Sequence, residues 1–269
     1  MLGKLMKYEF KATGRIFLPL FAALLILSAV NRLLLALGLQ TPANVGIGVA
    51  GILVVGICVL AFVLTLQRFR HNLLSSEGYL MMTLPTSVDS LILSKVITAV
   101  VWILASFAVV IVSVLIMAST ANSWKVISDA VDYIRNHLSL SAGQITIYII
   151  EAFVAAILGI FSGIQLIYAC MSLSMLVNKR RGLFAFGAFI VITTAMQIIS
   201  SILIVIGVAL NIFGAFGNMS NGLSVTLNGT SIFGQTQIAI LLGLLVEAVT
   251  YVIFYAITRY MLKNRLNLQ

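Results

Sequence analysis

The sequence has very few charged residues. Only 9% of its 269 residues are Asp, Glu, Lys or Arg, whereas soluble proteins contain about 25%. Hydrophobic residues make up 61% of the chain. This composition excludes a disordered chain, and it excludes a soluble domain because no soluble core buries so large an apolar share. Long, nearly uncharged runs recur, which indicates that lipid surrounds most of the chain.

Cysteine and histidine are also scarce, with two of each. Cys58 and Cys170 lie inside apolar runs, so we expect small packing residues and no disulfide framework. His71 and His137 are predicted on opposite sides of the membrane, which argues against a shared metal site or a catalytic dyad. The sequence contains neither H-E-x-x-H nor G-x-x-x-x-G-K-[ST]. We therefore expect no enzyme activity, no bound metal and no bound cofactor in this chain itself.

Apolar runs of sufficient length to cross a bilayer occur six times. A hydrocarbon core of about 30 Å requires about 20 helical residues. The runs cover residues 16–37, 45–66, 91–118, 144–177, 183–210 and 237–262. We predict an all-α integral membrane protein whose six transmembrane helices form a single transmembrane domain over residues 1–269.

The distribution of Lys and Arg predicts the orientation. Of the 16 basic residues, all but three fall on one face of this topology. The exceptions are Lys125 and Arg135 on the opposite face and Arg32 near the outer end of the first run. Because basic loops stay inside, both termini are predicted in the cytoplasm. The net charge of +9 is then mainly a topology signal, and nucleic acid is not an expected partner.

Residues 1–15 have the pattern of an amphipathic helix that lies in the membrane interface. On a helical wheel the basic residues cluster on one side, namely Lys4, Lys7, Lys11 and Arg15. Glu9 falls within the opposite, apolar stripe and has no lysine four residues away. It either takes a partner from elsewhere in the protein or lies on a helix that rolls enough to expose it to water.

The stretch 67–90, between the second and third runs, is predicted as a cytoplasmic loop with a short helix. Gly78 and Pro85 are expected breaks, and Thr86 with Asp89 resembles a capping box that opens the third run. Between the breaks lies an apolar segment too short to span the bilayer, formed by Tyr79, Leu80, Met81, Met82 and Leu84. It either folds back onto the protein or the lipid interface, or docks into a cytoplasmic subunit.

On the outer side we predict an interfacial helix over 119–143, from apolar residues at helical spacing, and a Gly-rich loop over 211–236. Ionisable residues within the membrane are costly and therefore informative. Arg32, Glu151 and Glu247 all fall in its outer half. One hypothesis pairs Arg32 with Glu151 across a helix interface. The alternative is that each carboxylate is neutral or snorkels alone.

Three segments resemble bacterial ABC-2 type transporter permeases. They are LGKLMKYEFKATGRIFLPLF from residue 2, EGYLMMTLPTS from residue 77 followed by LILSK, and NKRRG from residue 178. The resemblance implies two such subunits, as a homodimer or heterodimer, paired with separate P-loop ATPase subunits that hold ATP and Mg. It also implies an interfacial N-terminal helix and a coupling helix between spans two and three.

Under this resemblance, the residues that contact the ATPase are Glu9, Glu77, Gly78, Tyr79, Leu80, Met81, Met82, Leu84, Lys179 and Arg180. The expected function is ATP-driven export from a bacterial cell membrane. The apolar walls favour an amphipathic cargo such as a lipid, a hydrophobic drug or an antimicrobial peptide. Two alternatives remain: a membrane scaffold that does not transport, and an ion-driven secondary transporter.

Overall fold

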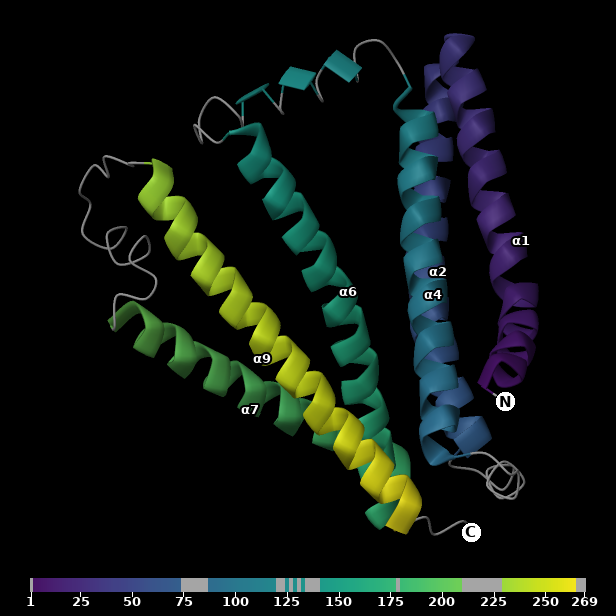
Figure 1. Cartoon of the computed structure of the whole chain (residues 1–269). Helices are drawn as coiled ribbons and strands as arrows, with labels where there is room; N and C mark the ends of the chain where they lie inside the picture. Colours follow the sequence, from purple (N-terminus) through teal and green to yellow (C-terminus); the bar gives the residue numbers. More distant parts are fainter. Residues whose placement is uncertain are drawn as a thin grey trace. The chain divides into compact units, whose positions relative to one another are not determined.

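The computed structural model describes residues 2–73, 87–119, 124–125, 128–129, 132–133, 141–177, 180–209 and 229–264. The elements of this part are all helices (Figure 1): α1 (Leu2–Ala36), α2 (Gln40–Leu73), α4 (Val88–Met117), α6 (Ala142–Leu173), the 3-10 turn η1 (Ser174–Leu176), α7 (Arg181–Ala209) and α9 (Gly229–Asn264). Six of them are long and apolar enough to cross a membrane. The chain is therefore an all-helical, multi-pass membrane protein.

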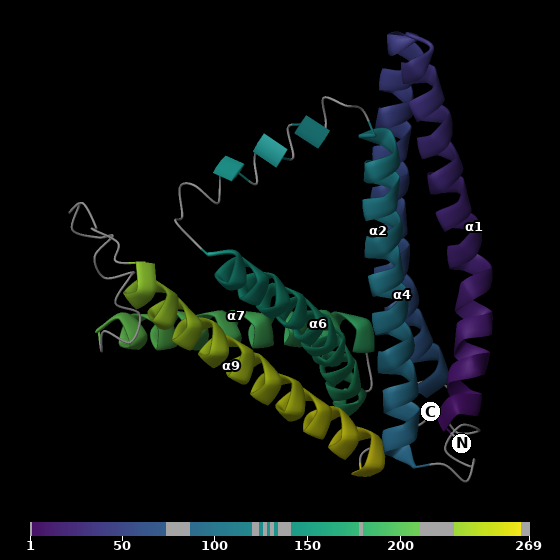
Figure 2. The ribbon, with the colours of Figure 1, turned by 45° about the horizontal axis from the view of Figure 1, so that its top comes forward.

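The helices form two compact units. Unit 1 spans Met1–Asp132 together with Leu266–Gln269 and contains α1, α2 and α4. Unit 2 spans Tyr133–Arg265 and contains α6, η1, α7 and α9. Within unit 1 all three helices contact one another, and within unit 2 helix α6 contacts α7, η1 and α9. Figure 2 shows α1, α2 and α4 side by side in a second view.

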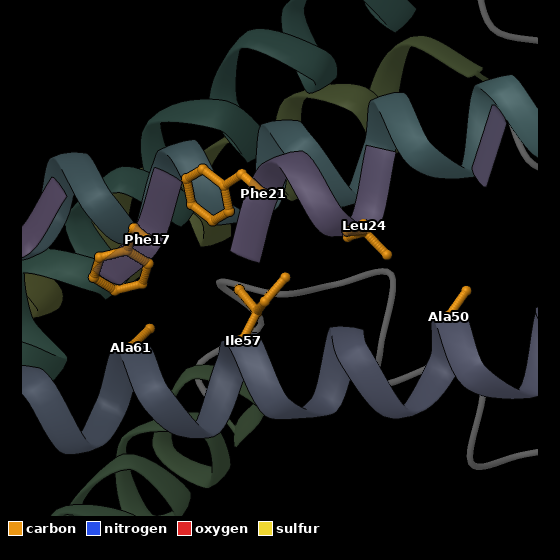
Figure 3. Packing of buried hydrophobic residues seen from close by; sticks show 6 residues of the cluster. All are labelled: Phe17, Phe21, Leu24, Ala50, Ile57 and Ala61. Carbon is orange, nitrogen blue, oxygen red and sulfur yellow. The ribbon is translucent and has the colours of Figure 1, made fainter. Parts of the chain in front are cut away.

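The core of unit 1 lies between α1 and α2, where two phenylalanines and a leucine of α1 pack against two alanines and an isoleucine of α2. Figure 3 shows this packing, formed by Phe17, Phe21, Leu24, Ala50, Ile57 and Ala61. Helix α4 closes the cluster with Trp102, whose ring stacks on Phe17 at a centroid distance of 4.8 Å. Ala50 and Ala61 are small and leave room for the phenylalanine rings between the two helices.

Helix α1 is continuous from Leu2 to Ala36, so the segment predicted at the interface and the first apolar run form one helix. Its 35 residues extend about 50 Å, more than the hydrocarbon thickness of about 30 Å. Pro19 lies inside it and removes the hydrogen bond to the carbonyl of Arg15. Lys7, Lys11 and Arg15 are exposed, and the side chain of Lys4 lies outside the described residues; the placement of this part of α1 in the membrane interface stays a prediction.

The turn between α1 and α2 is set by Gly38. This residue has φ of +74°, its N–H donates to the carbonyl of Leu35 (3.2 Å), and the N–H of Leu39 donates to that of Leu34 (3.0 Å). These are the two bonds of a Schellman motif, which satisfies carbonyls that the end of a helix leaves open. The left-handed conformation is available to glycine at little cost.

We expect Gly38→Ala to lower the free energy of unfolding by about 1 kcal/mol, because alanine is strained at positive φ. The change can be measured by urea titration in mild detergent micelles. Gly51→Ala on α2 is the matched control, since a Cβ there meets no atom within 4 Å. That variant is expected to be unchanged or slightly more stable. Equal losses in both variants would contradict the assignment of the turn.

Helix starts differ in detail from those predicted. The cap of α4 is Ser87, whose Oγ accepts from the N–H of Ser90 (3.2 Å), so the predicted box with Thr86 and Asp89 was wrong by one residue. Helix α6 begins with a true capping box, in which Ser141 and Gln144 each accept from the other's backbone N–H.

Two of the predicted outer segments fall partly within the described residues. Helix α9 begins at Gly229, so it includes the last part of the predicted loop 211–236. The residues before Gly229 in that loop lie outside the described residues. In 119–143, the described residues 124–125, 128–129 and 132–133 are helical. Residues 120–123, 126–127, 130–131 and 134–140 also lie outside the described residues.

Candidate functional site

Glu9 is the only acidic residue of α1, and it lies on the face that packs against α2 and α4. Its neighbours on this face, Thr13 and Phe17, are buried as well. Glu9 itself is 8% exposed. Burying a carboxylate costs several kcal/mol unless opposite charges or hydrogen bonds compensate it. Its partners therefore define the site.

Two cations from two other helices meet this carboxylate. Arg68 on α2 donates through Nη1 to Oε2 of Glu9 at 2.6 Å. Lys95 on α4 donates through Nζ to Oε1. The lysine side chain is 2% exposed and the arginine side chain 24%. We call Glu9, Arg68 and Lys95 the charged cluster; it joins all three helices of unit 1 at a single carboxylate.

The cluster carries more positive than negative charge, since two cations meet one anion. Each oxygen of Glu9 accepts from a different helix, so neither cation can replace the other. In the described part of the chain, Nε of Arg68 is buried without a hydrogen-bond partner. Removing one member of such a buried group is costly because it leaves the other charges uncompensated.

The cluster lies close to both ends of the predicted coupling segment. Arg68 is five residues before the end of α2 at Leu73, and Lys95 is seven residues after the start of α4 at Val88. The segment between these helices falls outside the described residues, and with it Glu77, Gly78, Tyr79, Leu80, Met81, Met82 and Leu84. The two helices that flank the segment are thus both bonded to α1 through Glu9.

The predicted second ATPase contact lies between η1 and α7. Lys179 falls outside the described residues, and Arg180 is exposed. Arg180 has φ of +56°, a left-handed backbone conformation that residues other than glycine rarely adopt. Its carbonyl accepts from the N–H of Phe184 (3.2 Å) and so begins α7. This placement in unit 2 keeps Arg180 in a separate unit from the charged cluster.

The intramembrane candidates fall in different units. Arg32 on α1 donates through Nε and Nη2 to the Oγ and carbonyl of Ser119, at 3.0 and 3.1 Å. In unit 2, Glu151 accepts from Nε2 of Gln237 at 3.1 Å, and Glu247 accepts from Oγ of Ser162 at 3.0 Å. The hypothesised pair of Arg32 with Glu151 stays a prediction.

Two groups that sequence reasoning passed over take part in these contacts. Arg68 and Lys95 were counted only as topology signals, although Glu9 within an apolar stripe required a partner. Polar residues inside the spans were not singled out either: Ser28 and Ser113 are buried and joined at 2.6 Å between α1 and α4. The signal that could have found them is the position of each polar residue on an otherwise apolar face.

Within the described ranges, no group of three or more His, Cys, Asp or Glu side chains is placed to hold a metal ion. Cys58 is exposed and Cys170 buried, and both are free. Comparisons with protein-family models, curated proteins and solved structures return no match for this chain.

Proposed function

We propose that this chain is the membrane-spanning subunit of an ATP-driven exporter in a bacterial cell membrane, with both termini in the cytoplasm. The proposal rests on the ABC-2 permease-like segments, the six apolar helices and the charged cluster. The chain would be paired with a second permease subunit and with separate P-loop ATPase subunits. ATP and Mg would be bound by the ATPase, and hydrolysis would occur there.

The observation that carries the proposal is the position of the charged cluster. A subunit driven by a partner requires a segment that receives force and a rigid connection to the rest of the bundle. Segment 74–86 joins α2 to α4, and both of these helices are bonded to α1 at Glu9. A displacement of the segment would therefore move three helices together.

The proposed cargo is amphipathic and moves outward. The helices expose many large apolar side chains, including Ile52 at 73% and Val191 at 67%. Such surfaces suit membrane lipid and lipid-like molecules, and few polar groups are available to replace the hydration shell of a sugar or a small ion. A lipid, a hydrophobic drug or an antimicrobial peptide fits this description.

One observation favours a second candidate, an ion-driven secondary transporter. The chain divides into two units of three long helices each. Many secondary transporters are built from two halves with similar numbers of helices. A scaffold that only recruits a partner is the third alternative.

The proposal is tested by purifying the tagged protein from its native membrane in mild detergent and identifying co-purifying chains by mass spectrometry. We expect a stoichiometric P-loop ATPase, lost in the variant Tyr79→Ala, Leu80→Ala, Met81→Ala. The control replaces Trp124 and Tyr133, exposed aromatic residues on the predicted outer side, with alanine and should keep the ATPase.

A folded wild-type protein recovered without any ATPase would contradict the proposal. ATP-independent uptake that depends on an ion gradient and is lost in Glu247→Gln would then support the secondary transporter. Absence of both results would leave the scaffold as the favoured function. Loss of the ATPase in the Trp124 and Tyr133 control as well would contradict the assignment of 77–84 as the docking segment.

A further inference from the structure

Helices α6 and α9 run parallel and are joined by polar side chains along their length. The pairs are Tyr148 with Thr236 (2.6 Å), Glu151 with Gln237 (3.1 Å), Ser162 with Glu247 (3.0 Å) and Gln165 with Thr258 (3.0 Å). Placing polar groups inside a membrane costs free energy. Those that occur there usually bind one another across a helix interface or serve a function. We call this row of four pairs the seam. Glu151 and Glu247 contribute the carboxyl groups of the seam, and the other two pairs contain only neutral side chains.

Glu247 lies near the middle of α9, where the surroundings are apolar. Its Oε1 accepts from Ser162 and is so close to α6 that a Cβ on Gly159 would lie 3.3 Å from it. Among the described residues it forms no ion pair, and the next arginine along α9, Arg259, is about 18 Å further along the axis. Glu247 is half-buried, so part of its side chain is accessible on the surface of unit 2.

Aromatic rings continue from this carboxylate along the same face of α9. Tyr251 and Tyr255 follow Glu247 at intervals of four residues, which places all three on one side of the helix. Tyr251 meets Phe161 of α6 edge to face, with ring centroids 6.0 Å apart, and stacks with Tyr255 at 6.3 Å. All of these rings are half-buried.

One further acceptor belongs to this seam. Gln165 is fully buried on α6, four residues after Phe161 and therefore on the same face. Its Nε2 donates to Thr258, whereas its Oε1 has no hydrogen-bond partner among the described residues. The region thus offers a carboxylate and ring faces, whereas this amide oxygen is buried.

A carboxylate beside aromatic rings attracts cations. Ring faces are negative and bind ammonium and other organic cations, more strongly when water is excluded. An anionic ligand would be repelled by the carboxylate of Glu247. A small hydrated metal ion would need several oxygen ligands, and no group of three or more His, Cys, Asp or Glu side chains is placed for this in the described part.

We propose that the Glu247, Tyr251, Tyr255 and Phe161 face binds cationic amphiphiles, meaning molecules with an organic cation and an apolar body. This deepens the proposed export function and rests on it for the statement that the bound molecule is cargo. Binding itself depends only on residues of unit 2. The carboxylate pairs with the cation, the rings contact it, and the apolar body lies against the neighbouring helix surface.

The test measures equilibrium binding of tetraphenylphosphonium, a hydrophobic organic cation, to the full chain in lipid nanodiscs. Tetraphenylborate, of nearly the same shape and opposite charge, is the matched ligand, and empty nanodiscs give the background. We expect saturable binding of the cation alone. Glu247→Gln should weaken it at least about tenfold, because a charge-assisted contact is lost.

A pair of tyrosine variants tests the site without altering a charge. Tyr251→Leu removes a ring of the proposed face and should weaken binding several-fold. Tyr260→Leu alters an exposed tyrosine nine residues further on, hence on the opposite side of α9, and should leave binding unchanged. Equal binding of both ions, or equal affinities in Tyr251→Leu and Tyr260→Leu, would overturn the proposal.

The result is separable from that of the export proposal. Because the binding assay uses the chain without any ATPase, cation binding with no co-purifying ATPase would support the site and contradict export driven by ATP. Conversely, a co-purifying ATPase with no selective cation binding would overturn the site alone and leave export intact.

Discussion

Glu9→Gln is expected to lower the free energy of unfolding by about 3–5 kcal/mol, the largest effect we predict for a single substitution. The glutamine keeps the shape of the side chain but removes its charge. Lys95, with a side chain only 2% exposed, would then keep a buried charge without an anionic partner among the described residues, and Arg68 would lose its charge-assisted bond. Unfolding in detergent micelles by urea titration provides the measurement.

Removing both members of the buried pair should cost much less than removing one. Of the charged cluster, the double variant Glu9→Leu, Lys95→Met leaves only Arg68, whose side chain is 24% exposed and can reach water. We therefore expect strong non-additivity in a double-mutant cycle. Lys11→Gln, at an exposed position of the same helix, is the control and should change stability by less than about 0.5 kcal/mol. A comparably small change in Glu9→Gln would contradict the structural role of the cluster.

Gly46→Ala is expected to cost about 1–3 kcal/mol, the second-largest effect. Asn31 on α1 is 1% exposed, and its amide donates to the carbonyl of Ala43 (2.8 Å) and accepts from the N–H of Ile47 (3.1 Å). The side chain of Asn31 therefore bonds both the N–H of Ile47 and the carbonyl of Ala43. In a regular α-helix these two groups pair with each other. A Cβ at Gly46 would lie 2.6 Å from a terminal atom of this amide.

The control for this prediction is Gly48→Ala, because a Cβ there meets nothing within 4 Å. It should be neutral or slightly stabilising, as alanine is the better helix former. In an Asn31→Ala background the space at Gly46 is free, so adding Gly46→Ala should cost little more. Additive losses in that double variant would show that the close approach of Asn31 is not the cause.

The number and approximate position of the membrane helices could be predicted from the sequence because long uncharged runs have few alternatives to spanning lipid. The helix ends could not. Consecutive Thr86 and Ser87 are both good capping residues, and only the geometry selects Ser87. The continuity of α1 from Leu2 to Ala36 was also missed, because the change at residue 15 from an amphipathic pattern to an apolar run is equally compatible with one helix and with two.

The charged cluster was predictable only in part. Glu9 on an apolar stripe indicates a buried carboxylate that requires a cation, and this follows from one helix alone. Its partners lie 59 and 86 residues away, so their identity depends on how three helices are aligned. The same limit applies to Asn31, since its bonds to α2 depend on the packing of two helices around Gly46.

We propose that the charged cluster makes α1 and α2 move together when the proposed partner ATPase binds ATP. Spin labels at Tyr8→Cys and Arg70→Cys, both exposed, report the distance between these helices in a Cys58→Ser, Cys170→Ala background. In the reconstituted complex we predict the same distance distribution with and without ATP, and a broadened, ATP-dependent one in Glu9→Leu, Lys95→Met. An ATP-dependent shift in the parent protein, or an unaltered distribution in the double variant, would contradict the claim.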